Sequence, residues 1–206
     1  MRIAQTVVAG VAAAVVLSVS IAGCGSDSTS STSKSGSATP ATSTRSSAPT
    51  SLAPAQSSDY TRLLIQASDV DAPIPFTATP PTNNPNGQQG VATTFRDEDG
   101  SHVIKDTIQV FADPAAATNA LNAAKGQQGD AIKDPTTQPA NVGTGGTTLL
   151  GNSPDRSKGV TILLFTEGRA FVTLEFDGPT DAAAPQDFVN DVGQKQDAAI
   201  KKGLGG

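Results

Sequence analysis

The chain has 206 residues, with 14 basic and 19 acidic side chains and a formal net charge of −5. An acidic chain without a cluster of basic residues argues against nucleic acid as a partner, and against binding to anionic lipid headgroups by charge. Its one cysteine, Cys24, excludes a disulfide within the chain, so the folded part must be stable through its hydrophobic core.

The N-terminus has the pattern of a secretory signal. Arg2 supplies a positive charge, and residues 3–21 are almost uncharged and rich in valine and alanine. A small Ala-Gly pair follows, which predicts a signal peptide over residues 1–23 that is cleaved between Gly23 and Cys24. A transmembrane helix is the alternative, because the run is near the length that spans a bilayer, but the small residues at its end favour cleavage.

The tetrapeptide Ile-Ala-Gly-Cys at residues 21–24 resembles the lipobox of bacterial lipoprotein precursors. The resemblance implies that the thiol of Cys24 receives a diacylglyceryl group. Each buried methylene contributes about 0.8 kcal/mol, so two or three acyl chains give a stable anchor where one does not. We therefore expect a lipid anchor on Cys24 and a location on the extracytoplasmic face of the cell membrane. The alternative is a plain secretory signal with an accidental cysteine.

Low hydrophobicity is the main feature of the next segment. Residues 25–58 are mostly serine, threonine, alanine and proline, with Leu52 as the single large aliphatic side chain. Such a composition cannot bury enough apolar surface to offset the entropy of ordering, which predicts a disordered tether over residues 24–58. Serine and threonine clusters beside proline are also typical of O-glycosylated stalks, and a bare stalk is an equal alternative.

The remaining residues, 59–206, contain all seven phenylalanines and the single tyrosine, and predict one domain. In chain order we first expect a short helix at 59–64, a proline-rich loop at 71–90, and strands at 91–95 and 103–111 around a hairpin turn at 97–100. A helix follows from Pro114 to Gly126 or Gly129, and after a polar loop come strands at 147–150, 160–166 and 170–177. A last helix runs from Pro185 to about Gly203. This order predicts an α+β fold, in which an antiparallel sheet has its helices packed on one side.

Few residues of the domain are candidates for chemistry. His102 is the only histidine and follows the predicted turn, where a solvated side chain is expected. Asp97, Glu98 and Asp99 have oxygens that suit Ca²⁺, but the glycine comes too early for a calcium loop and the turn explains them better. The chain also has no Gly-x-Ser-x-Gly elbow for a nucleophilic serine. We therefore predict no catalytic residue and no metal site.

Two further patterns also have ordinary structural explanations. Glu175 and Asp177 share one face of a strand and could act as acid and base, although a solvent-facing strand surface explains them equally well. The glycine-rich segment 141–146 lacks the Lys-Ser/Thr pair of a phosphate-binding loop and is more typical of a connection. Asp106 interrupts the apolar face of the strand at 103–111. No cofactor is expected from these patterns.

Two segments of the domain carry a further resemblance. One is Leu-Leu-Ile-Gln-Ala-Ser-Asp-Val at 63–70, and the other is Gln-Val-Phe-Ala-Asp at 109–113, a strand that leads into an alanine-rich helix with alanines at 115–117. With the lipobox and tether, they resemble the surface lipoproteins of mycobacteria and related actinobacteria, and in particular their extracellular sensor-like domains. The chain departs from many kinase-linked sensors, which have paired cysteines. A PsbP-like fold is compatible with the same element order. Neither family implies a catalytic residue here.

Two classes of function remain open. The first is a non-catalytic binding module that holds an envelope partner protein or a small apolar ligand between sheet and helices. The second is an envelope hydrolase or transferase with an unrecognised site. A large apolar cavity would favour the small ligand, an exposed groove over a filled core would favour a protein partner, and a cleft with converging carboxylates would favour the enzyme.

Overall fold

The computed structural model describes residues 59–180 and 182–205. The elements in this part of the chain are η1 (Thr61–Leu63), η2 (Ala67–Asp69), β1 (Thr77–Ala78), β2 (Thr82–Asn83), η3 (Pro85–Gly87), β3 (Gly90–Arg96), β4 (Val103–Val110), α1 (Pro114–Lys125), η4 (Gln128–Asp130), β5 (Lys133–Pro139), β6 (Thr144–Asn152), β7 (Gly159–Glu167), β8 (Ala170–Gly178) and α2 (Gln186–Leu204), where η denotes a 3₁₀ turn. The predicted signal peptide (1–23), the lipidation site Cys24 and the tether (24–58) lie outside the described residues.

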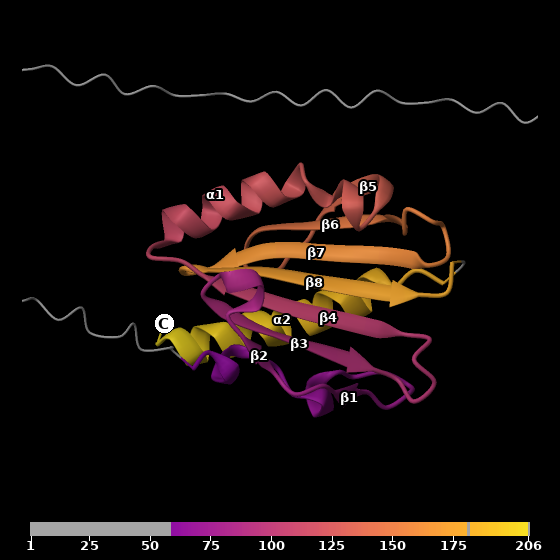
Figure 1. The fold of residues 1–206 in the computed structure, drawn as a ribbon, viewed down its shortest axis with the longest axis horizontal. Coiled ribbons are helices and arrows are strands. Elements are labelled where there is room, and N and C mark those ends of the chain that lie inside the picture. Colours follow the sequence, from indigo (N-terminus) through magenta and orange to yellow (C-terminus); the bar gives the residue numbers. More distant parts are fainter. Residues whose placement is uncertain (1–58, 181, 206) are drawn as a thin grey trace, which may run out of the picture. The chain divides into compact units, whose positions relative to one another are not determined.

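The strands form one antiparallel sheet in the order β1-β3-β4-β8-β7-β6-β5, with the short β2 also paired to β3 (Figure 1). Strands β4, β8 and β7 occupy its middle, and β4 pairs with β8 although about 60 residues separate them in the chain. The α+β class and the antiparallel sheet predicted from the sequence are confirmed.

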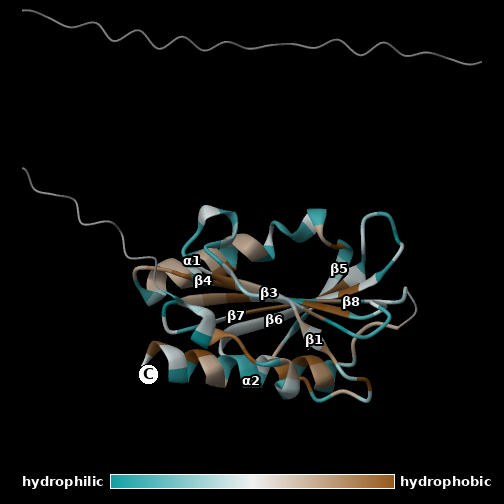
Figure 2. Ribbon diagram, turned by 60° about the horizontal axis from the view of Figure 1, so that its bottom comes forward, coloured by the Kyte–Doolittle hydropathy of each residue, from teal (hydrophilic) through white to brown (hydrophobic). Residues whose placement is uncertain are grey.

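The two long helices cover opposite faces of this sheet, with α1 on one side and α2 on the other (Figure 2). The alternation along β7 explains why. Ile162 and Leu164 pack in one core with α1, whereas Leu163 and Phe165 pack in the other core with α2. A strand that is apolar at almost every position is covered on both faces. The expectation that the helices pack on one side is therefore wrong, and the nearly continuous apolar run of β7 was the signal for it.

Local chemistry sets the helix boundaries as predicted. Oδ1 of Asp113 accepts a hydrogen bond from the backbone N–H of Ala116 at 2.8 Å, and Pro114 occupies the first helical position of α1. Gly126 caps the other end of α1. Helix α2 begins directly after Pro185, and Gly205 ends it with a φ of 75°.

Three parts of the sequence fold differently from the expectation. The predicted helix at 59–64 is reduced to the 3₁₀ turn η1, and the expected loop at 71–90 contains β1, β2 and η3. The polar segment that becomes β5 is not among the strands predicted from the sequence, because it contains two prolines and no apolar alternation. Both prolines are tolerated because β5 is an edge strand. Within the described residues, no helix has the length and apolar character needed to cross a membrane.

Candidate functional site

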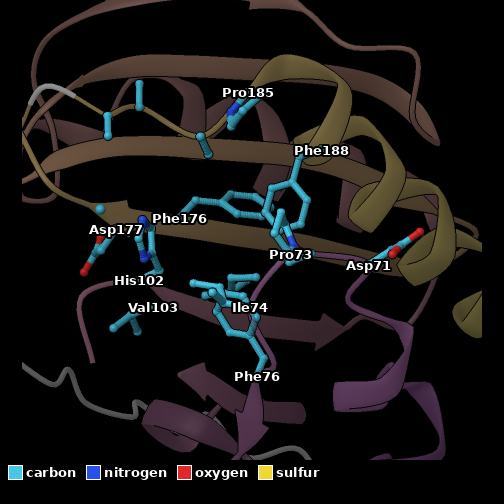
Figure 3. A pocket seen from close by; sticks show the side chains of 16 residues that line it. Asp71, Pro73, Ile74, Phe76, His102, Val103, Phe176, Asp177, Pro185 and Phe188 are labelled. Carbon is cyan, nitrogen blue, oxygen red and sulfur yellow. The ribbon is translucent and has the colours of Figure 1, made fainter. Parts of the chain in front are cut away.

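A cavity of about 480 Å³ lies at the end of the sheet where β4 begins and β8 ends (Figure 3). Its walls also include residues 71–74 and 76, residues 182–185 before α2, and Phe188 in the first turn of that helix. The cavity therefore lies on the α2 face of the sheet, where the two core strands diverge from the helix. None of its lining residues was predicted as a binding residue from the sequence.

Aromatic side chains form the main wall of the cavity. The rings of Phe176 and Phe188 meet edge to face, with centroids 5.8 Å apart. Phe76 and Ile74 reach the same space from the loop before β1 (Figure 3). Ile74 is 40% exposed and is the only large apolar side chain among the described residues with such exposure. Apolar surface left open beside a hollow is typical of a binding site.

The sequence keeps this space open in two ways. Ile104 and Phe176 are paired across β4 and β8, so both project from the same face of the sheet into the cavity wall. Opposite them, residues 182–184 are three successive alanines, whose side chains are too short to fill the gap. At Gly178 a Cβ would lie 3.0 Å from the backbone oxygen of Ala182, so glycine allows this segment to pack closely on the end of β8.

His102 is the one imidazole in the cavity wall, and its side chain is 41% exposed. Its Nδ1 lies 2.8 Å from Oδ2 of Asp97 and 3.0 Å from Oγ of Ser101. The backbone N–H of His102 also donates to both oxygens of Asp97, at 3.1 Å each. The expectation of a merely solvated histidine is corrected, because a buried carboxylate fixes the ring in the wall of a cavity.

Asp97 itself is held as an anion. Burial alone would raise its pKa, but the hydrogen bonds from His102 and Ser101 outweigh burial and lower the pKa to about 2. An ionised carboxylate only accepts hydrogen bonds, so Nδ1 of His102 must donate its proton to Asp97. The predicted turn at residues 97–100 is confirmed, and Asp97, Glu98 and Asp99 act there as turn residues: the N–H of Gly100 bonds to the carbonyl of Asp97 at 3.3 Å.

Asp177 is also among the residues at the cavity, but its side chain projects from the opposite face of β8 to that of Phe176 and is only 5% exposed. Its Oδ2 lies 3.2 Å from Nζ of Lys105 and 3.4 Å from Nζ of Lys158, whereas its Oδ1 has no hydrogen-bond partner among the described residues. Lys105 also lies 2.6 Å from Glu175. Lys105 thus lies between Glu175 and Asp177 and forms ion pairs with both carboxylates. The two residues are therefore not arranged as an acid and a base.

Asp106 is the other unusual carboxyl group, and it lies outside the cavity. It projects from the middle of β4 into the core beneath α2, is fully buried, and neither of its oxygens has a hydrogen-bond partner in the described part of the chain. Burial raises its pKa to about 8. Among residues 59–180 and 182–205, no three histidine, cysteine or acidic side chains converge in a way that could hold a metal ion.

The glycine-rich segment 141–146 forms the turn from β5 to β6 and the first residues of β6, so it is only in part the connection expected from the sequence. Val142 inserts into the core beneath α2, and Gly143 and Gly145 adopt positive φ values of 51° and 68°. A side chain at Gly143 would overlap the ring of Phe165. These glycines are explained by close packing, and no phosphate-binding chemistry is needed to account for them.

Comparison of the chain with known protein families and with curated proteins found no match. The assignment of a function therefore depends on the cavity and on its own residues. Phe176, on the predicted strand at 170–177, is buried in the core, and Phe188, on the predicted last helix, packs against it. The contribution of Ile74 and Phe76 was missed, although an apolar pair beside Pro75 in an otherwise polar loop was a usable signal.

Proposed function

We propose that this protein is a non-catalytic binding module that holds a small apolar ligand in the cavity beside α2. In this proposal it is anchored to the extracytoplasmic face of the cell membrane by lipid on Cys24. The observation that supports the ligand most directly is the cavity of about 480 Å³, with its wall of phenylalanine, isoleucine, proline and alanine side chains. Cavities for small molecules usually measure about 300–1,000 Å³ and are mostly apolar.

The energetics of the wall favour an apolar occupant. Phe176 is almost fully buried, but Ile74, Phe76 and Phe188 each keep part of their surface exposed. Covering apolar surface contributes about 25 cal/mol per Å². A ligand that fills the cavity removes this surface from water without rearranging the core, because the space is already open.

A binding role is better supported than hydrolysis or group transfer. A histidine held by a carboxylate resembles part of a catalytic triad, but such a site also needs a nucleophile next to the free ring nitrogen. The one hydroxyl that contacts the ring is Oγ of Ser101, and it lies beside Nδ1, which Asp97 already occupies. Among the described residues, no hydroxyl group lies within hydrogen-bond distance of Nε2.

A partner protein is also less well supported than a small ligand. Protein partners usually bind across a broad patch, whereas the exposed apolar surface here surrounds a hollow between two strands, a loop and a helix end. The concave shape suits a molecule that enters the domain.

Tryptophan fluorescence offers a direct test, because the chain contains no tryptophan. Phe188→Trp places one indole in the cavity wall, and Phe111→Trp places one on the opposite face, in the core with α1. Both phenylalanines are partly buried, which makes the second variant a matched control. The chain from residue 24 onward, with Cys24→Ser to avoid acylation, is titrated with 1-bromooctane, whose bromine quenches indole fluorescence only on contact.

We expect saturable quenching in the Phe188→Trp chain and little quenching in the Phe111→Trp chain. Ala183→Phe, which adds a ring to the cavity wall, should abolish the quenching in the Phe188→Trp background. Equal quenching of both indoles, or quenching that does not saturate, would show that the alkyl chain does not bind in the cavity and would refute the proposal.

A further inference from the structure

The imidazole of His102 is a polar group in an otherwise largely apolar cavity wall. Nδ1 donates to Asp97, so an imidazole that carries only this one proton has a lone pair on Nε2 that accepts hydrogen bonds. Nε2 has no partner among the described residues. A ligand atom beside it must therefore supply a proton for a hydrogen bond.

Asp177 does not offer a second acceptor. It follows Phe176 on β8 and is paired with Val160, which packs in the core with α1, so its side chain leaves the sheet on the face opposite the cavity. There its Oδ2 lies 3.2 Å from Nζ of Lys105 and 3.4 Å from Nζ of Lys158. Nε2 of His102 is therefore the acceptor that this end of the cavity offers to a ligand (Figure 3).

The charge of the wall argues against an acidic head on the ligand. The described residues that line the cavity include Asp71 and Asp177 but no lysine or arginine. A carboxylate beside His102 would lie near the anion of Asp97 and would have no lysine or arginine in the wall to pair with. An ammonium group there is disfavoured for another reason: the phenylalanine, isoleucine and alanine side chains around the hollow cannot solvate a cation.

On the basis of the proposed function, we propose that the ligand is an apolar alcohol. Its uncharged hydroxyl group donates to Nε2 of His102, and its hydrocarbon body packs between Phe76, Phe176 and Phe188. The same arrangement selects against fatty acids of equal length.

The test compares four ligands with the same eight-carbon chain in the Phe188→Trp background: octane, 1-octanol, octanoate and octylammonium. Each competes with 1-bromooctane at pH 7.5, and the recovery of indole fluorescence gives its affinity. We expect 1-octanol to bind about fivefold or more tightly than octane and than either charged analogue, because one additional hydrogen bond contributes about 1 kcal/mol.

Two variants identify the group responsible. His102→Leu should reduce the preference for the alcohol over octane by severalfold, while 1-bromooctane still quenches and so reports that the cavity is intact. Glu98→Gln, an exposed change in the same hairpin, should keep the full preference. If His102→Leu fails to fold, the relative affinities of the four ligands for the chain with His102 intact still test the alcohol inference.

The outcomes separate the two proposals. The alcohol inference would be overturned if octanoate or octylammonium bound as tightly as 1-octanol, or if the preference for the alcohol survived His102→Leu. In either case, saturable quenching by 1-bromooctane would still support the binding cavity. An absence of any saturable quenching would instead refute the proposed function itself.

Discussion

His102 is bound twice by Asp97, five residues earlier in the chain: its backbone N–H lies 3.1 Å from each carboxylate oxygen, and its Nδ1 lies 2.8 Å from Oδ2. One buried carboxylate thus closes the turn between β3 and β4 and also fixes the orientation of the ring in the cavity wall. The stability of the hairpin and the geometry of the site are therefore coupled through a single side chain.

The first prediction concerns Asp97→Asn. The amide replaces an anionic acceptor with a group whose NH₂ faces other donors, so we expect a loss of about 1–3 kcal/mol in the free energy of unfolding at pH 7. The folded-state pKa of about 2 lies below the ordinary value of 3.8. The stabilisation by Asp97 is therefore present above about pH 4 and is lost as the pH falls toward 2.

Chemical denaturation at pH 7 and at pH 2.5 measures this difference between the native chain and the variant. The difference in the free energy of unfolding between the native chain and Asp97→Asn should be smaller at pH 2.5 than at pH 7. Glu98→Gln, in the same turn, serves as the control and should change the free energy of unfolding by less than about 0.5 kcal/mol. An equal difference in the free energy of unfolding at both pH values would contradict the role given to the Asp97 carboxylate.

The second prediction concerns Asp106, which is paired with Leu174 across β4 and β8 and is fully buried without a hydrogen bond in the described residues. Burial raises its pKa in the folded state to about 8, above the ordinary value of 3.8. The stability linked to its proton is therefore fully present below about pH 4 and is lost progressively as the pH rises toward 8.

Asp106→Asn keeps the shape of the side chain and cannot ionise. We expect the native chain to lose stability relative to this variant by as much as about 1.4 kcal/mol per pH unit between pH 5 and pH 8. Urea denaturation of both chains at several pH values measures the difference, in which the contributions of all other groups cancel. Parallel stability curves over this range would show that Asp106 does not retain its proton in the fold.

The fold could be predicted where local chemistry determines it. Three elements are specified by residues close together in the sequence. They are the start of α1 at Asp113-Pro114, the turn at Asp99-Gly100, and β8 with its alternating Val172, Leu174 and Phe176. The edge strand β5 could not be recognised, because its pairing with β6 is made by the backbone and its exposed side chains leave no hydrophobic pattern.

The cavity could not be predicted for a related reason. Its wall combines residues from the loop before β1, the ends of β4 and β8, and the start of α2, which are far apart in the sequence. Phe176 and Phe188 have the pattern of ordinary core residues, and the short side chains of residues 182–184 leave space beside their rings. Similarly, the bond between His102 and Asp97 depends on the path of the turn and not on a sequence motif.

The third prediction concerns the contact of α2 with the sheet. A Cβ added at Gly193 would lie 2.5 Å from Cδ2 of Leu163 and 3.1 Å from Cγ2 of Val142, closer than side chains normally approach. Gly193→Ala should therefore destabilise the domain by about 1–3 kcal/mol, although alanine favours a helix over glycine by about 1 kcal/mol. Gly129→Ala, where nothing lies within 4 Å, is the control and should cost little. Thermal unfolding measures both, and an unchanged or raised Tm for Gly193→Ala would show that α2 packs less closely on β7.

The last prediction concerns the anchor, which we infer from the Ile-Ala-Gly-Cys sequence at residues 21–24. Acylation requires the thiol of Cys24, and attachment to the membrane requires two or more acyl chains, because one alone binds only weakly and reversibly. Cys24→Ser should therefore abolish incorporation of labelled fatty acid and should leave uncleaved precursor or release the protein to the medium. Detergent phase partitioning of the protein from cells measures the change, with Ser26→Ala as a control that should remain in the detergent phase. A Cys24→Ser protein that is still cleaved and still partitions into detergent would refute the lipoprotein assignment, because the chain contains no other cysteine that could be acylated.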